Sequence, residues 1–196
     1  MLAWMRRINW PVSAVIALGL VVGLFGLCCP LAFADEGGTE PLAGGENQLQ
    51  PRLYFILDDS AAGGWGHAAI IICDGTGYFY YSYGPTDKYG PTGLITATFS
   101  DWASALAYAK SGDPVNKYTY EAHWDVSVSQ AHGAMAVAAS YAGTQYQLLV
   151  HNCWSMVYDA IHSAVGDLRI QDRGASPNVN YNYNKNPPFA DGASKL

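Results

Sequence analysis

The sequence predicts an α+β fold in which a mostly antiparallel sheet is packed by helices. Two strand-length segments, 67–73 and 78–83, flank the turn signal Asp-Gly-Thr-Gly, as in a β-hairpin. An Ala-rich helix is expected after Ser127, which fits a capping box with Gln130, and an amphipathic helix is expected over 152–165. The second helix places Cys153 at its N-terminus, and we expect it to pack against the sheet.

The other elements follow from local patterns. Segment 52–57 is a short apolar strand, and a helix is expected from the capping residue Ser100 to about 110. Segment 118–126 alternates as in a half-buried strand with one solvated face. The polar segment 178–188 is typical of an edge strand or a disordered tail. The buried face of 118–126 is expected to hold Tyr118, Tyr120, Ala122, Trp124 and Val126, and the solvated face Thr119, Glu121, His123 and Asp125.

The first 34 residues have the pattern of a secretory signal peptide. Two N-terminal arginines precede an uncharged apolar run over 11–27, which is short for a membrane-spanning helix of about 20 residues. Ala-Phe-Ala at 32–34 then offers a cleavage site before Asp35. We expect a secreted or cell-surface protein, with an uncleaved membrane anchor as the alternative. Residues 35–50 are expected to be a flexible linker.

The charge balance restricts the partners. The chain has 16 acidic and 10 basic residues, and loss of the signal peptide removes Arg6 and Arg7, which leaves 8 basic residues and a formal net charge of −8. Nucleic acids and anionic membranes bind positively charged surfaces. We therefore expect no nucleic-acid partner, and membrane contact only through an uncleaved signal segment.

Two cysteines, Cys73 and Cys153, lie outside the predicted signal peptide. In an exported protein such a pair commonly forms a disulfide. The alternative is that Cys153 is a reactive thiol, because a helix N-terminus lowers the pKa of a thiol and its free N–H groups can hold an oxyanion. Cys73 ends an apolar run, which is typical of a buried, inert thiol.

His67 is the candidate general base for Cys153, because it opens a strand just after a Gly-rich loop. Cys73 lies six residues further along the same strand, about 20 Å away at 3.3 Å per residue. A Cys153 that reaches His67 cannot also reach Cys73. The catalytic and disulfide interpretations therefore exclude each other.

A third residue is needed to orient the histidine. A hairpin closed on its Gly-Thr turn places Gly84 opposite His67 and makes Ser82 the diagonal neighbour on the same face, within side-chain reach. Asp58 and Asp59, at the end of the preceding strand, are the alternatives. Their ordinary role is turn formation and solvation.

Three short motifs together resemble a known superfamily. They are Gly-His opening a strand at 66–67, Tyr-Ser-Tyr-Gly-Pro at 81–85, and Asn-Cys opening a helix at 152–153 after Tyr146. This pattern is similar to the circularly permuted branch of the papain-like cysteine hydrolases, which are NlpC-like domains in which histidine precedes cysteine. In unpermuted members cysteine comes first, and this chain departs from that order.

The resemblance covers roughly residues 52–165 and predicts a catalytic domain over 51–170. It implies peptidase, amidase or acyl-transfer chemistry through a cysteine thioester. By carry-over, Cys153 is the nucleophile and His67 the base. The resemblance implies no cofactor.

Other side chains are assigned as follows. Aromatic residues beside the candidate site are expected to contact substrate, namely Trp65, Trp154 and Tyr83. The sequence has no HExxH, no CxxC and no Gly-rich phosphate loop, so neither a metal nor a nucleotide is predicted. The remaining histidines, at 123, 132, 151 and 162, are interpreted as loop, strand-face or helix-surface residues.

The expected function is hydrolysis of an amide bond outside the cytoplasm by a secreted cysteine hydrolase. Cell-wall peptide is the first candidate substrate, by analogy with the family. One alternative is a non-enzymatic domain of the same fold that binds glycan or peptide. The other is a secreted acyl or lipid hydrolase, or a toxin, that uses the same pair of residues.

Export generates the first prediction. The mature N-terminus should be Asp35, because the small residues Ala32 and Ala34 fit signal peptidase. Intact-mass measurement of secreted protein tests this. Recovery of the full-length chain in the membrane fraction would instead support an anchor.

Overall fold

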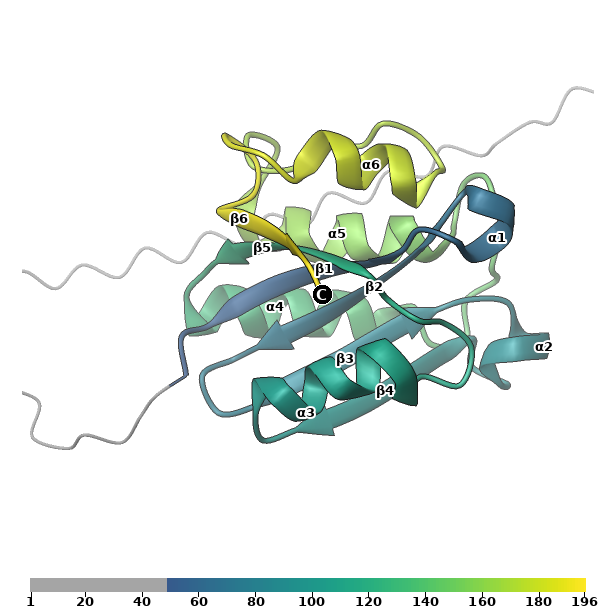
Figure 1. Cartoon of the computed structure of the whole chain (residues 1–196), viewed down its shortest axis with the longest axis horizontal. Coiled ribbons are helices and arrows are strands. Elements are labelled where there is room, and N and C mark those ends of the chain that lie inside the picture. The colour runs from purple at the N-terminus through teal and green to yellow at the C-terminus, as the bar shows by residue number, and fades with distance from the viewer. Residues whose placement is uncertain (1–48) are drawn as a thin grey trace, which may run out of the picture. The chain divides into compact units, whose positions relative to one another are not determined.

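A computed structural model describes residues 49–196, so the predicted signal peptide and nearly all of the predicted linker lie outside the described residues. The described part is an α+β fold with a six-stranded antiparallel sheet of order β4-β3-β2-β1-β5-β6 (Figure 1). The strands are β1 (Arg52–Asp58), β2 (His67–Cys73), β3 (Tyr78–Tyr83), β4 (Leu94–Phe99), β5 (Tyr120–Asp125) and β6 (Gly192–Lys195). The helices are α1 (Ala61–Gly64), α2 (Thr86–Tyr89), α3 (Trp102–Ala107) with a π-helical turn over Tyr108–Gly112, α4 (Val128–Ser140), α5 (Cys153–Val165) and α6 (Pro177–Asn184). Between residues 49 and 196, no helix combines the length and hydrophobicity that a membrane span requires.

The predicted hairpin is confirmed, with the predicted bounds for β2 and β3. Asp74 Oδ1 accepts hydrogen bonds from the backbone N–H groups of Thr76 and Gly77, at 2.8 and 3.1 Å, and so closes the turn. The register pairs Ala69 with Ser82. The sequence analysis assigned no element to β4, which pairs with β3 at the edge of the sheet.

Both faces of the sheet are covered. On one face, α4 and α5 pack against alternate residues of the strands, and this main core contains Leu53, Phe55, Ala68, Ile70, Trp124, Met156 and Ile161. On the other face, α3 and its π-helical turn cover a second core that contains Tyr54, Ile56, Ala69, Ile71, Cys73, Tyr80 and Tyr118. Figure 1 shows α3 in front of the sheet with α4 and α5 behind it.

Capping residues fix where the two long helices begin. Ser127 and Gln130 form the predicted capping box of α4. Asn152 caps α5 by accepting a hydrogen bond from the Ser155 N–H at 3.0 Å, while Ser155 Oγ accepts from the Asn152 N–H at 3.2 Å. This second capping box makes Cys153 the first residue of α5.

The alternation expected over 118–126 is wrong at two positions. Tyr118 precedes β5 and packs in the second core instead of facing the same way as Ala122. Glu121 was expected on a solvated face but is only 5% exposed. Its carboxylate accepts a hydrogen bond from Ser194 Oγ at 2.8 Å and lies 3.1 Å from His123 Nδ1, because β6 pairs beside it.

The edge strand or tail expected over 178–188 is also wrong, because most of this segment is α6. Its buried residues, Pro177, Asn180, Tyr181 and Asn184, follow helical spacing. Pro177 opens the helix, where its missing N–H costs nothing. The alternating aromatic residues obscured this pattern in the sequence. The edge strand of the C-terminal region is β6 instead.

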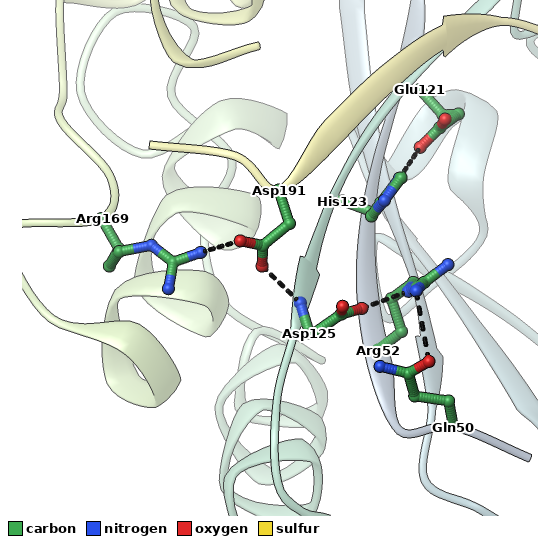
Figure 2. A network of polar contacts seen from close by, with 7 residues as sticks. All are labelled: Gln50, Arg52, Glu121, His123, Asp125, Arg169 and Asp191. Atoms are coloured by element: carbon green, nitrogen blue, oxygen red, sulfur yellow. Dashed lines mark hydrogen bonds and ion pairs between the residues drawn. The ribbon is translucent and has the colours of Figure 1, made fainter. Parts of the chain in front are cut away.

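A polar network ties the C-terminal region to the sheet (Figure 2). Asp191 accepts hydrogen bonds from Arg169 Nη2 at 2.7 Å and from the Asp125 N–H at 2.8 Å. The Asp125 carboxylate in turn pairs with Arg52 Nε at 2.5 Å. Since Arg52 begins β1 and Asp125 ends β5, the network links these strands to the segment that leads into β6.

A buried asparagine of α6 generates the second prediction. Asn180 is fully buried, and its carboxamide bonds to the backbone of Arg173, Gly174 and Ser176. Asn180→Ala should lower the free energy of unfolding by about 2–4 kcal/mol, because each buried group left unpaired costs about 1–3 kcal/mol. Urea denaturation measures this, and exposed Asn182→Ala on the same helix should stay within about 0.5 kcal/mol of wild type. Equal effects of the two variants would contradict the prediction.

Candidate active site

The candidate nucleophile lies where the N-terminus of α5 meets the sheet. Cys153 is 4% exposed and packs in the main core together with Ala68 of β2. Ala68 directly follows His67 in β2. The thiol is therefore packed against the strand that carries the candidate base.

The sheet opens at this point. β1 pairs with β2 as far as His67, whereas the pairing of β2 with β3 extends only to Ala69 and Ser82. Beyond Ser82 the chain continues through Gly84, and a Cβ there would clash with the ring of Tyr89. The absence of a side chain at Gly84 lets Tyr89 fill the space beside His67.

His67 is 7% exposed and is held by two hydroxyl groups. Its Nε2 lies 3.0 Å from Ser82 Oγ and 3.1 Å from the Tyr89 hydroxyl. The predicted contact between Ser82 and His67 is therefore confirmed. Within the described residues Nδ1 has no hydrogen-bond partner, so Nδ1 is the nitrogen left to exchange a proton with another group.

The alternative orienting residues, Asp58 and Asp59, make no hydrogen bond to His67. Asp58 Oδ1 accepts from the backbone N–H groups of Ser60 and Ala61, and its Oδ2 accepts from the Lys117 N–H at 3.0 Å. Asp59 Oδ1 accepts from the Thr119 hydroxyl. Both are turn and loop contacts.

The sequence analysis missed a buried polar network behind Ser82. Ser82 Oγ lies 3.1 Å from the Tyr118 hydroxyl, which lies 2.9 Å from that of Tyr80, and the Tyr80 hydroxyl donates to Asp113 Oδ2 at 2.6 Å. Tyr80 could have been found from the sequence, because it lies two residues before Ser82 on the same strand face. Asp113 could not, because α2, β4, α3 and the π-helical turn separate it from β3 in the chain.

Burial determines the protonation states of Cys153 and His67. It raises the pKa of Cys153 to about 11, more than offsetting the hydrogen bonds that favour the thiolate. The backbone N–H groups of the helix N-terminus lower this pKa as expected, but burial outweighs them, so the expected low pKa of the Cys153 thiol is wrong. Burial also lowers the pKa of His67 to about 4, although Asp113 and Asp58 oppose this change. Both groups are neutral at pH 7.

Both cysteines are free, which removes the disulfide alternative. Cys73 points into the second core and Cys153 belongs to the main core, so the sheet lies between the two side chains. The predicted burial of Cys73 is confirmed, and that burial raises the pKa of its thiol.

A cavity of about 320 Å³ opens beside His67. Its lining is mostly apolar or aromatic, and Lys88 is its one charged side chain. The residues around it are Ala61, Ala62, His67, Pro85, Lys88, Tyr89, Val115, Asn116, Tyr146 and Leu148. The cavity offers space for a substrate next to the candidate base.

Two of the three predicted substrate contacts are corrected by burial. Trp154 is 2% exposed, and its Nε1 donates to Asp172 Oδ1 at 2.9 Å, so its role is in the core. Tyr83 is fully buried, and its hydroxyl contacts Thr144. Trp65, two residues before His67, is 49% exposed. Its contact with substrate remains a prediction.

The remaining histidines lie apart from this site. His123, His132 and His162 each lie near one carboxylate, that of Glu121, Asp74 and Asp167 respectively. The ring of His151 stacks on that of Tyr141, with the centroids 4.7 Å apart. In the part of the chain that the structure describes, no three His, Cys, Asp or Glu side chains gather in a way that could hold a metal ion.

The protonation of Cys153 generates the third prediction. In a Cys73→Ser variant, the rate of alkylation of Cys153 by iodoacetamide should rise about tenfold per pH unit from about pH 7 to 10 without levelling, because the thiolate is the reactive form. An ordinary cysteine, with a pKa of about 8.5, levels off near pH 9. Mass spectrometry of the labelled peptide gives the rate, and levelling below about pH 9 would contradict the burial effect.

The site thus combines a buried thiol at a helix N-terminus, an imidazole held by hydroxyl groups, and an adjoining apolar cavity. Comparison of the chain with protein-family models, curated proteins and solved structures finds no match.

Proposed function

We propose that the protein is a cysteine hydrolase of the permuted papain-like type that cleaves an amide bond outside the cytoplasm. The observation that carries this proposal is the placement of Cys153, at the N-terminus of α5, in the same core cluster as Ala68, the residue that follows His67 in β2. The free Nδ1 of His67 and the adjoining cavity support it. Cell-wall peptide remains the first candidate substrate, on the basis of the predicted export and the family resemblance.

The proposed reaction begins with attack of Cys153 Sγ on the carbonyl carbon. As the S–C bond forms, the thiol proton passes to Nδ1 of His67. Because the pKa values are about 11 and about 4, transfer before attack is unfavourable, so the transfer accompanies bond formation. His67 then gives the proton to the leaving nitrogen as the C–N bond breaks and a thioester remains.

Hydrolysis of the thioester completes the cycle. Water attacks the thioester carbonyl while His67 takes one of its protons. The C–S bond breaks, the carboxylic acid leaves, and the proton returns to the Cys153 sulfur. The free backbone N–H groups at the start of α5 are the candidate donors to the oxyanion in both steps.

A second candidate function is hydrolysis of an acyl ester, with the same residues in the same roles. The apolar lining of the cavity favours it. Leu148, in the loop before Cys153, lines the cavity and is 56% exposed, so the cavity has an apolar rim. An aliphatic acyl group would gain about 25 cal/mol for each Å² of apolar surface that it buries there.

Mutation of the pair generates the fourth prediction. Cys153→Ala and His67→Ala should each lower the rate of hydrolysis at least about 10²–10⁴-fold. Ser82→Ala should lower the rate less, because Ser82 only orients the histidine that transfers the proton. The assays are release of peptide from purified cell wall and cleavage of a chromogenic acyl ester. Cys73→Ala is the matched control, since it removes the other buried thiol.

Two results would contradict the proposal. Full activity of a folded Cys153→Ala protein would make this cysteine structural. A wild type that binds glycan or peptide but cleaves neither amides nor esters would establish the non-enzymatic binding domain. Circular dichroism checks the folding of each variant.

A further inference from the structure

We infer that Asp113 is a positioning residue that fixes the tautomer of His67 through a chain of three hydroxyl groups. The chain runs from Asp113 through Tyr80, Tyr118 and Ser82 to Nε2 of His67. It holds the imidazole proton on Nε2 and leaves the lone pair of Nδ1 free. Only the catalytic consequence of this inference rests on the proposed function.

The direction of the chain is set at Asp113, which is buried and surrounded by donors. Its Oδ1 accepts from the backbone N–H groups of Val115 and Asn116, at 2.8 and 2.5 Å. Its Oδ2 accepts from the Tyr80 hydroxyl at 2.6 Å. A carboxylate only accepts hydrogen bonds, so the Tyr80 proton must point at Asp113.

The direction then propagates, because a hydroxyl group has one proton. Tyr80 can only accept at its other contact, so Tyr118 donates to it across 2.9 Å. Tyr118 must then accept from Ser82 Oγ across 3.1 Å. Ser82 has no proton left for His67, so Nε2 must supply the proton for the 3.0 Å contact.

The opposite direction leaves a buried contact without a proton. If Ser82 donated to Nε2, Tyr118 would have to donate to Ser82. The oxygens of Tyr80 and Tyr118, 2.9 Å apart, would then have no hydrogen between them, because the Tyr80 proton is held by Asp113. Unpaired buried polar atoms cost about 1–3 kcal/mol. Only the direction that starts at Asp113 satisfies all four contacts.

Tyr89 is the competing partner of Nε2, at 3.1 Å. If its hydroxyl donated to Nε2, Ser82 Oγ would face an unprotonated nitrogen at 3.0 Å with no hydrogen between them. Asn116 Nδ2 donates to the Tyr89 oxygen at 2.5 Å, so this oxygen already acts as an acceptor. Nε2–H can therefore be shared by both oxygens, whereas an unprotonated Nε2 satisfies only one.

The consequence for catalysis concerns Nδ1. A neutral imidazole has one N–H and one lone pair, so a proton on Nε2 makes Nδ1 the acceptor. Nδ1 is the nitrogen that the proposed reaction uses. Asp113 thus acts on His67 through three hydroxyl groups and need not contact the substrate.

Asp113→Asn tests the inference because it should reverse the chain. The two backbone N–H groups require an acceptor, so the amide oxygen should take the place of Oδ1 and turn its NH₂ group toward Tyr80. Tyr80 must then accept, each hydroxyl must reverse, and Ser82 must donate to Nε2. ¹⁵N NMR of the His67 ring should show the N–H on Nε2 in the wild type and on Nδ1 in the variant.

The control is Asp74→Asn. Asp74 closes a similar turn with two backbone N–H groups but has no link to His67, so its variant should keep the wild-type tautomer and activity. Tyr80→Phe is the second variant, because it cuts the chain and leaves the turn of Asp113 intact. It should give a mixture of the two tautomers.

Activity provides a separate readout. Asp113→Asn should lower kcat at least about 10²-fold, and a triad histidine in the wrong tautomer loses about 10⁴-fold in a serine protease. An N–H on Nδ1 in the wild type, or on Nε2 in both Asp113→Asn and Tyr80→Phe, would overturn the inference. Reversal of the tautomer by Asp113→Asn, together with a wild type that cleaves neither amides nor esters, would support the positioning role and reject the proposed function.

Discussion

The structure depends on the burial of one helix end against an opened sheet edge. The Asn152 cap starts α5 where β2 loses its pairing with β3, so the first residue of the helix meets a segment of β2 that is paired with β1 alone. Cys153 and Ala68 pack together there in the main core. The thiol is thereby held against the strand that carries the histidine.

The same burial sets the electrostatics of the site. A helix N-terminus stabilises a thiolate by a modest amount, whereas removal of the thiolate from water is costly. At Cys153 desolvation is the larger effect, and at His67 it likewise disfavours the charged form. The resting pair is therefore neutral. In such a site the arrangement of protons, rather than a stored ion pair, determines reactivity.

The sequence predicted the structural features that depend on neighbouring residues. The hairpin turn, the capping box of α4, the start of α5 near Asn152 and the diagonal contact of Ser82 with His67 follow from neighbours in the sequence. The pKa of Cys153 could not be predicted, because it depends on how deeply the helix end is buried. Glu121 was wrongly expected to face solvent, and the role of Asp113 was not predicted. Both residues are buried by segments that are distant in the sequence. Burial of Tyr83 and Trp154 likewise depends on how the helices pack.

The order of the sheet has a consequence for solubility. β4 is an edge strand, and its sequence, Leu-Ile-Thr-Ala-Thr-Phe, contains no charge and no proline. Uncharged edge strands rich in β-formers are templates for intermolecular pairing and aggregation. Flanking residues Pro91 and Asp101 act as breakers on either side of the segment. The opposite edge, β6, is only four residues long and carries Lys195, so the tendency to self-associate is concentrated at β4.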